Sequence, residues 1–316
     1  MAAGTNKIVG KPRIFIDGEA GTTGLEIRER LAGIGTIDVK SIDAALRKDR
    51  QARTEMMRDV DLVVLCLPDD AAREAVAIAD ELKAKAPKIV DASTAHRVAD
   101  GWVYGFAELA PGQADAIKTA KRVANPGCYP TGAIALIRPL VDAGIIPADY
   151  PITVNAVSGY SGGGRSMIEA YEAGTAPSFE LYGLGLEHKH IPELQKYSGL
   201  TRRPIFVPGV GNFRQGMLVS VPLHLDTLSS KPNLADLETL LTAYYKGSQL
   251  VSVVAGAAGK VARLEAEAVN GTDKLELFVF GKPGLNQAVL VARLDNLGKG
   301  AAGAAVQNIK LMLNLD

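Results

Sequence analysis

The sequence predicts two domains: an α/β domain built on a parallel sheet, followed by an α+β domain with a mostly antiparallel mixed sheet. Three observations support this prediction. Short apolar strands alternate with helices over the first 127 residues, and a glycine-rich turn joins the first strand to the first helix. From residue 128 onward, longer strands with hairpin-like links replace that alternation. The length of 316 residues also favours two domains.

The first domain begins with an apolar strand at 14–16, and the helix after it repeats apolar residues at spacings of four and three: Ile27, Leu31 and Ile34. Further strands are predicted at 37–42, 61–68 and 88–93. Residues 61–68 are apolar nearly throughout, as a strand buried on both faces should be. A helix starts at Pro68-Asp69-Asp70 and carries an apolar stripe: Ala72, Val76, Ala79 and Leu82. Strands that alternate with helices imply right-handed crossovers.

The second domain begins with a predicted buried helix over 131–141, because these residues are apolar nearly all round. Extended segments follow at 150–159, 204–209 and 216–225, and residues 274–297 predict two strands around a Gly-Pro turn. The last stretch, 298–313, predicts a helix with an apolar face made by Val306, Ile309 and Leu313.

The composition limits the classes of partner. Lys+Arg 35 balances Asp+Glu 35, so no global charge favours nucleic acid, and an anion must be held by local arginines and backbone amides. Two cysteines cannot form a disulfide framework, which suits a reducing compartment. The N-terminal segment has no signal-peptide core, and no stretch approaches the roughly 18 apolar residues of a membrane span. We expect a cytoplasmic protein that acts on a small molecule, without nucleic-acid or membrane partners.

The turn "GEAGTTG" (18–24) spaces its glycines as G-x-x-G-x-x-G between a strand and a helix. Glycines there let the backbone approach a pyrophosphate, and the helix N-terminus offers free N–H groups to it. The alternative is a tight turn with close packing. We favour a Rossmann-type cofactor site that includes Gly18, Gly21, Thr22, Thr23 and Gly24.

The residues near the second strand favour NADP over NAD. An NAD site should have an acid there for the ribose hydroxyl, and Asp43, the only near acid, comes slightly late. Hydroxyl and basic groups suit a 2′-phosphate, although surface lysines are common for other reasons; the candidates are Lys40, Ser41, Arg47 and Lys48.

The two cysteines differ in their surroundings. Cys66 lies between two leucines in a buried strand and reads as a small core residue. Cys128 lies in the turn "NPGCYPTG" (125–132), and a helix begins within a few residues of it. A thiol at a helix N-terminus is pushed toward the thiolate, which is the nucleophile. The alternative is a cysteine that happens to lie in a turn.

A nucleophilic cysteine beside a dinucleotide suggests one chemistry. Attack on an activated acyl group gives a thioester, which hydride reduces to a thiohemiacetal that collapses to an aldehyde. A proton carrier is needed, normally histidine. His188 and His190 in the polar stretch "EHKHIPE" are favoured, whereas His224 reads as a strand residue. A metal site is disfavoured because no further ligand cluster has zinc-like spacing.

Four segments together resemble the shorter form of the N-acetyl-gamma-glutamyl-phosphate reductase family: "NPGCYPTGAI", "AVSGYSGGGR", "EHKHIPE" and "LDNLGKGAAGAAVQN". The resemblance covers nearly the whole chain. It implies an NADPH-dependent step of arginine biosynthesis that converts an acyl phosphate into an aldehyde. It also implies a relationship to aspartate-semialdehyde dehydrogenase and glyceraldehyde-3-phosphate dehydrogenase, in which a C-terminal helix returns to the first domain. We therefore place the NADP-binding domain at 1–127 and 297–316, and the catalytic and oligomerisation domain at 128–296.

The resemblance implies roles for individual residues. It makes Cys128 the nucleophile and the H-x-H segment the source of the acid/base, with His188 preferred to His190 and Glu193 orienting the histidine. The expected substrate-binding residues are Arg97, Asn125, Arg165 and Arg214. The expected cofactor-binding residues beyond the glycine turn are Ser41, Pro68, Ser93, Ser161, Gly162 and Asn296. Relatives pair through the second domain, so a homodimer or homotetramer is expected.

Two departures from the more common long form stand out. "DASTAHR" has His96 where an aromatic residue is usual, and "GEAGTTG" has a glutamate and two threonines where a serine and tyrosine are usual. These changes affect the fine cofactor contacts. Two alternatives stay open: reduction of another acyl group, such as aspartyl phosphate or an acyl group on a carrier protein, and a non-catalytic NADP sensor. The sensor is disfavoured because it has no need of a thiolate.

Overall fold

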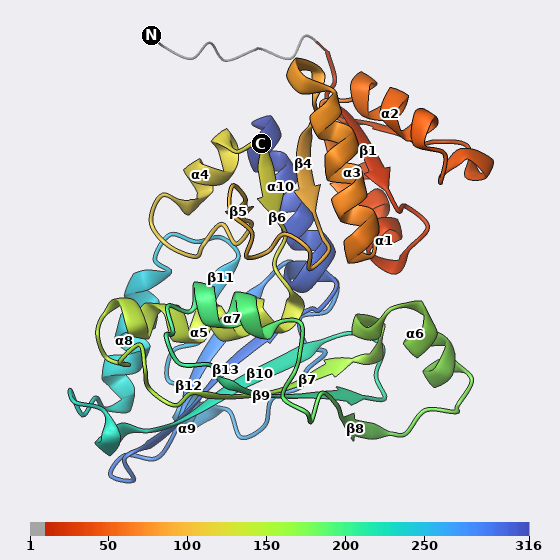
Figure 1. Cartoon of the computed structure of the whole chain (residues 1–316). Helices are drawn as coiled ribbons and strands as arrows, with labels where there is room; N and C mark the ends of the chain where they lie inside the picture. The colour runs from red at the N-terminus through yellow and green to blue at the C-terminus, as the bar shows by residue number, and fades with distance from the viewer. Residues whose placement is uncertain (1–9, 316) are drawn as a thin grey trace, which may run out of the picture.

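The computed structural model describes residues 10–315, so the first part of the segment in which we expect no signal peptide lies outside the described residues. The chain forms two domains, each with its own sheet (Figure 1). In the first domain every pair of neighbouring strands is parallel, in the order β2-β1-β3-β4-β6-β5. The strands are β1 Arg13–Asp17, β2 Asp38–Lys40, β3 Leu62–Leu65, β4 Lys88–Asp91, β5 Val103–Tyr104 and β6 Arg122–Ala124.

Helices cover both faces of this parallel sheet. Alternate side chains of β1 explain why: Ile14 and Ile16 pack on one helical layer, while Phe15 packs on the other. The first layer contains α1 (Thr22–Ala32), α4 (Gln113–Thr119) and α10 (Gly303–Leu313), and the second contains α2 (Arg50–Asp59) and α3 (Asp69–Glu81). The predicted parallel α/β domain is therefore confirmed. Ile34 and Leu82 fall just beyond the helices to which the sequence assigned them.

The second domain is built on a seven-stranded mixed sheet in the order β11-β12-β13-β10-β7-β9-β8. Four neighbouring pairs are antiparallel, and β11–β12 and β7–β9 are parallel, which confirms the predicted mixed sheet. Strand β10 alternates buried and more exposed residues, as a sheet with one covered face requires. The strands are β7 Thr153–Gly159, β8 Phe179–Leu181, β9 Ile205–Gly211, β10 Met217–His224, β11 Val251–Val253, β12 Leu275–Phe280 and β13 Gln287–Leu294.

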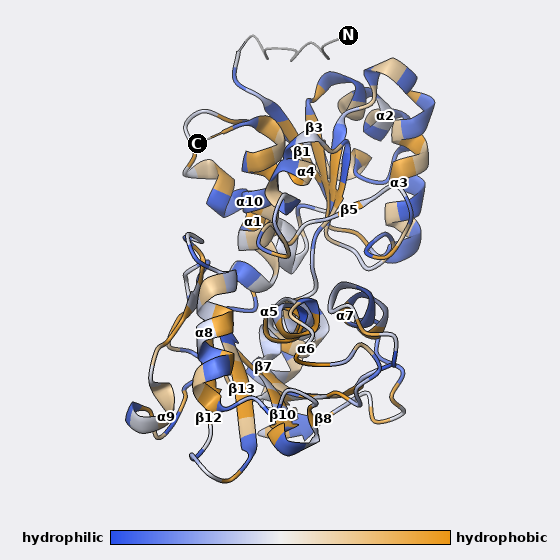
Figure 2. Ribbon diagram, turned by 90° about the vertical axis from the view of Figure 1, so that its left-hand side faces the viewer, coloured by the Kyte–Doolittle hydropathy of each residue, from blue (hydrophilic) through white to orange (hydrophobic). Residues whose placement is uncertain are grey.

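Helix α5 (Cys128–Asp142) lies at the centre of the second domain. It packs on β10 and β13 and is flanked by α7 (Ile191–Tyr197) and α8 (Leu234–Tyr244), so nearly all its faces are buried (Figure 2). This burial explains the almost continuous apolar sequence that predicted the helix. Two shorter helices complete the domain, α6 (Arg165–Glu172) and α9 (Ala257–Lys260). Short 3₁₀ segments lie at η1 Ala44–Leu46, η2 Lys83–Lys85, η3 Tyr160–Gly163 and η4 Leu225–Thr227.

The C-terminal segment connects the two domains. The helix predicted over 298–313 is divided into a π-helical segment, η5 (Gly298–Ala302), and α10. Helix α10 packs on α1, α4 and β4 of the first domain, whereas η5 contacts α5 of the second. Gly300 lets η5 approach the start of α5, because a Cβ at this position would lie only 2.9 Å from the Cβ of Cys128. The segment therefore links the parallel sheet to the cysteine turn.

Among residues 10–315, no helix combines the length and the apolar character needed to cross a bilayer.

Candidate active site

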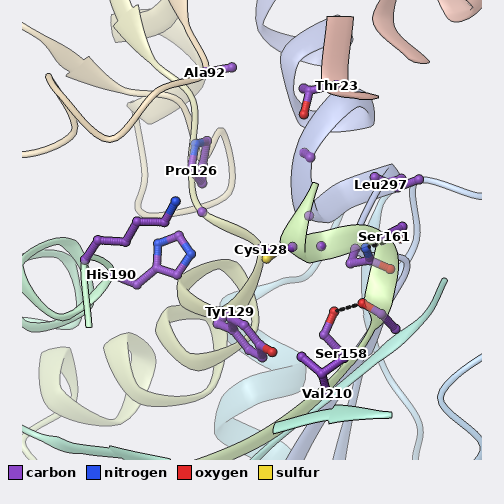
Figure 3. Close-up of a pocket in the computed structure, with 18 of the residues that line it drawn as sticks. Thr23, Ala92, Pro126, Cys128, Tyr129, Ser158, Ser161, His190, Val210 and Leu297 are labelled. Carbon is purple, nitrogen blue, oxygen red and sulfur yellow. Dashed lines mark hydrogen bonds between the residues drawn. The ribbon is translucent and has the colours of Figure 1, made fainter. Parts of the chain in front are cut away.

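A cavity of about 330 Å³ lies where the carboxyl ends of the parallel strands meet the start of α5. Figure 3 shows Cys128 at its centre, with the His190 ring on one side and Ser161 on the other. This is the position expected for a ligand site in a parallel α/β sheet. The cavity brings together these predicted residues: Thr23, Arg97, Asn125, Cys128, Ser161, Gly162, His188, His190 and Asn296.

Cys128 is the first residue of α5, as the turn predicted. Gly127 caps the helix without a side-chain hydrogen bond, so the positive end of the helix dipole faces the sulfur. Burial nevertheless raises the pKa of the Cys128 thiol, although Arg97, the Tyr129 amide and Lys189 act in the opposite direction. The helix start alone therefore does not produce the thiolate that the sequence suggested, and the thiol requires a base.

A buried carboxylate, Glu193, organises the residues around the cysteine. Its Oε1 accepts from Arg97 Nη1 at 2.6 Å and lies 2.7 Å from His190 Nδ1. Its Oε2 accepts from Tyr104 Oη at 2.7 Å and from the Gly127 amide at 3.0 Å. Burial alone would raise the pKa of this carboxyl, but Arg97, His190 and the Gly127 amide outweigh it and lower the pKa to about 2. Glu193 is therefore ionised at neutral pH.

The ionised Glu193 fixes the tautomer of His190. We place the proton on Nδ1, where it donates to Glu193, and this leaves Nε2 as the acceptor. Arg97 Nη1 also lies 2.9 Å from Nδ1, but two donors cannot bond to each other, so both are directed at the shared carboxylate oxygen. Burial lowers the pKa of His190, against the opposing effect of Glu193. A neutral imidazole beside the cysteine turn is a competent general base.

His188 has a different environment. Its Nδ1 accepts from the His190 amide at 3.1 Å, and its ring packs against Tyr129, Tyr182 and Phe206. Burial lowers the pKa of His188 to about 4. No carboxylate holds its ring among the described residues. The geometry thus favours His190, the reverse of the preference drawn from the sequence.

Two cations line the cavity, and only one of them was predicted. Arg97 is 7% exposed and donates to Glu193, to the Asn125 carbonyl at 3.0 Å and to the Ala92 carbonyl at 3.3 Å. Lys189 is exposed, and its ammonium makes no hydrogen bond or ion pair within residues 10–315. The sequence feature that could have identified Lys189 is its position between the two histidines of the H-x-H segment. Lys189 is therefore better placed than Arg97 to bind an incoming anion.

Asn125 and Asn296 hold the walls of the cavity. Asn296 Nδ2 donates to Ser161 Oγ at 2.9 Å (Figure 3). Asn296 Oδ1 accepts from the Gly216 amide at 2.8 Å. Asn125 Nδ2 donates to the Ala301 carbonyl at 3.0 Å, which ties the cysteine turn to η5. Both side chains are nearly fully buried. They fix the loops that present Cys128 and Ser161.

A second cavity of about 260 Å³ lies along the glycine-rich turn, and Thr23 lines both cavities. Gly18 has φ +92°, and a Cβ there would collide with the Cys66 carbonyl, so only glycine fits this turn. Helix α1 starts with no side-chain cap and no acidic residue in its first turn, which leaves its amides free for a phosphate. The predicted turn residues that line this cavity are Gly21, Thr22, Thr23 and Gly24. These features fit a dinucleotide.

Arg165 lies at the glycine turn rather than at the cysteine. Its Nη2 donates to the Ala20 carbonyl at 2.8 Å, and it lines the second cavity together with Gly164. The sequence assigned Arg165 to the substrate, whereas its position in the structure faces the cofactor cavity. The loop that carries it therefore connects the second domain to the nucleotide-binding turn.

The structure places the remaining predicted residues outside both cavities. Arg214 is on the surface and pairs with Glu172 at 2.8 Å. Ser93 donates to Asp91 at 2.8 Å, and Pro68 is the residue that precedes α3. Ser41 donates to Glu19 at 2.8 Å. Direct contact between these four residues and a ligand would require a structural change or a ligand that extends beyond the two cavities.

His96 and Cys66 have structural roles. Asp91 lies 2.6 Å from His96 Nδ1, and the His96 ring stacks on Trp102, which explains a histidine in "DASTAHR". Cys66 follows β3, and burial raises the pKa of its thiol to about 12, so it stays protonated. Within residues 10–315, no group of three or more His, Cys, Asp or Glu side chains is arranged to hold a metal ion.

The chain matches two family models that divide it near the cysteine. Residues 23–119 match the semialdehyde dehydrogenase NAD binding domain, and residues 128–296 match the semialdehyde dehydrogenase dimerisation domain. Solved structures of low sequence identity share the fold. Aspartate semialdehyde dehydrogenase II from Vibrio cholerae is 15% identical with a TM-score of 0.73, covering 96% of this chain and 99% of its own. Aspartate semialdehyde dehydrogenase with NADP from Candida albicans is 14% identical with a TM-score of 0.67, covering 96% and 99%.

Curated relatives are much closer in sequence. The N-acetyl-gamma-glutamyl-phosphate reductases of Brucella ovis and Brucella anthropi are each 54% identical over 309 residues, covering 96% of this chain and 99% of their own length. A match over 96% of the chain includes most of both domains. The chain therefore belongs to the semialdehyde dehydrogenases and, among them, to the N-acetyl-gamma-glutamyl-phosphate reductase family.

Proposed function

We propose that this chain reduces N-acetyl-L-glutamyl 5-phosphate to N-acetyl-L-glutamate 5-semialdehyde and phosphate with NADPH, as a step of arginine biosynthesis in the cytoplasm. The observation that carries the proposal is the placement of Cys128 at the start of α5, in one cavity with a histidine that a buried carboxylate orients. The family supports the substrate, and the relative from Candida albicans, solved with NADP, supports the cofactor.

The first half of the reaction forms a thioester. His190 Nε2 takes the thiol proton while Cys128 Sγ attacks the acyl carbon, so the S–C bond forms and the C–O bond to phosphate breaks. Glu193 stabilises the imidazolium that results, because its carboxylate already accepts from Nδ1. Lys189, whose ammonium has no partner among residues 10–315, is the cation that would hold the phosphate, whereas Arg97 fixes Glu193 in place.

The second half releases the aldehyde. NADPH bound along the glycine turn would supply a hydride to the thioester carbon, which gives the oxyanion of a thiohemiacetal on Cys128. As this oxyanion collapses to the aldehyde the C–S bond breaks, and His190 returns its proton to the departing thiolate of Cys128. Ser161 and Asn296 are hydrogen-bonded to each other in the wall of the cavity that contains Cys128.

The reaction can be tested in reverse. The enzyme is given N-acetyl-glutamate semialdehyde and NADP, with and without phosphate, and NADPH absorbance is followed for wild type and Cys128→Ser. Phosphate-dependent NADPH formation that the serine variant lacks supports the proposal. Turnover of aspartate semialdehyde alone would keep the mechanism and change the substrate. Binding of NADP without any turnover would favour the sensor.

We also infer that the face of the mixed sheet opposite α5, which the segment around Val261 covers only in part, pairs with a second copy of the chain. An apolar groove of about 750 Å³ crosses this face, between β8 and the segment around Val261. Phe179 and Leu181 on β8 are 54% and 47% exposed, which is unusual for large apolar side chains gathered on one surface. The domain matches a family model named for dimerisation. A homodimer that buries this face, alone or within a homotetramer, accounts for the exposure.

A further inference from the structure

An internal carboxylate occupies the cluster of basic groups at the end of the second strand. Glu19, directly after Gly18, accepts from Arg28 Nη1 at 2.6 Å and from Ser41 Oγ at 2.8 Å through Oε2. Its Oε1 accepts from Arg47 Nη2 at 3.2 Å. The Glu19 side chain is 12% exposed, whereas both arginines are more than two fifths exposed. Three separate segments of the first domain therefore converge on one acceptor.

The cluster adjoins a cavity of about 190 Å³ that Glu19, Arg47 and Lys48 line together with the end of β1. In a Rossmann-type domain the adenosine ribose lies beside the end of the second strand. Two guanidinium groups, a hydroxyl and a lysine are donors suited to a phosphomonoester, and they exceed what one carboxylate requires. Asp43, the only acid near the second strand that could have bound the ribose hydroxyl, instead accepts a hydrogen bond from the Ala45 amide.

We propose that Glu19 is an internal competitor for the 2′-phosphate, an inference that rests on the proposed use of NADP. A 2′-phosphomonoester carries more negative charge and more acceptor oxygens than a carboxylate, so it displaces Glu19 from Arg28, Ser41 and Arg47. The exchange lowers the affinity for NADP below what the basic cluster could provide. NAD has no 2′-phosphate and leaves Glu19 in place, so Glu19 sets the affinity for NADP and the margin over NAD.

The test is calorimetric binding of 2′-AMP, AMP and NADP to Glu19→Gln and to a matched control, Glu29→Gln. Glu29 is an exposed acid on α1, the helix that follows the turn containing Glu19, and it makes no ion pair within residues 10–315. Removing the competing charge should tighten 2′-AMP and NADP binding about tenfold, the size expected for a few partly exposed charge contacts. AMP binding should not change, and Glu29→Gln should behave as wild type. Unchanged or weaker NADP binding by Glu19→Gln would overturn the proposal.

A second variant tests the donors directly. Arg28→Met should weaken 2′-AMP binding, and the loss should be larger in the Glu19→Gln background, where the guanidinium is free for the phosphate. An equal loss in both backgrounds would contradict competition.

The proposed competition by Glu19 and the proposed reaction can fail separately. If Glu19→Gln tightens 2′-AMP but no acyl phosphate is reduced, the competitor stands and the proposed reaction is wrong. If the enzyme is active but Glu19→Gln changes nothing, only the competitor is wrong.

Discussion

Among single residues, the proposed mechanism depends most on which histidine takes the proton of Cys128. His190 is neutral, oriented by Glu193 and adjacent to the cysteine turn, whereas the ring of His188 packs among aromatic side chains. We expect His190→Asn to lower kcat by about a hundredfold or more, the usual contribution of a general base, and His188→Asn to have a much smaller effect. Steady-state rates of both purified variants check this, and a larger loss for His188→Asn would reverse the assignment.

Glu193 should also contribute stability that depends on pH. Its pKa is about 2 in the folded protein, below the ordinary value of 4.5. The contribution is therefore complete above pH 4.5 and is lost as pH falls through 2; it amounts to about 3 kcal/mol at neutral pH. We expect Glu193→Gln to lower the free energy of unfolding strongly at pH 7, and the difference from wild type to shrink on acidification.

Urea unfolding at pH 7 and at lower pH measures that difference. The matched control is Glu172→Gln, which removes an exposed carboxylate paired with Arg214 and should cost less than about 1 kcal/mol. A deficit of Glu193→Gln that stays constant with pH would show that the lost packing, and not the charge, is responsible.

At the scale of elements, the glycine turn and the start of α1 must stay in close contact. Gly24 packs so tightly on the Gly18 carbonyl that a Cβ would force the helix away from the strand. We expect Gly24→Ala to weaken NADP binding about tenfold or more, because the displaced helix end no longer directs its amides at the pyrophosphate. Gly33→Ala, at the other end of α1, has room for its Cβ and should bind as wild type. Equal affinities in calorimetry would contradict this role of the turn.

The sequence predicted the elements whose patterns are local. Strands β1, β3 and β4 are short apolar runs, and α5 was recognised because it is buried on most sides. Helix α2 was missed because it buries only Arg53 and Met57 and therefore has no apolar period. Strands β5 and β6 were missed because they have two and three residues.

The residues of the site also divide into those that a local motif predicts and those that it does not. Cys128 and the two histidines stand in local motifs that the sequence displays. The contact of Arg97 with Glu193 spans 96 positions, and no periodicity predicts such a contact. Tertiary packing brings Arg97 to Glu193, places Lys189 in the cavity and joins Arg28 to Glu19. These features could therefore be seen only in the structure.

For the molecule as a whole, we expect self-association through the exposed face of the mixed sheet. Phe179→Glu places a charge on that apolar face and should shift the protein to a smaller assembly, because burying an unpaired carboxylate is unfavourable. Leu46→Glu, on an exposed side chain of the first domain, should leave the assembly unchanged. Light scattering gives both masses, and an unaltered mass for Phe179→Glu would exclude this face.

The nucleophilic role of Cys128 can be tested by the intact mass of the protein after mixing with N-acetyl-glutamyl phosphate in the absence of NADPH. Wild type should gain one N-acetyl-glutamyl group, the group should map to Cys128, and His190→Asn should acquire it more slowly. Cys128→Ser should form no thioester. An adduct at another residue, or turnover that proceeds undiminished in Cys128→Ser, would contradict the assignment of Cys128 as the nucleophile.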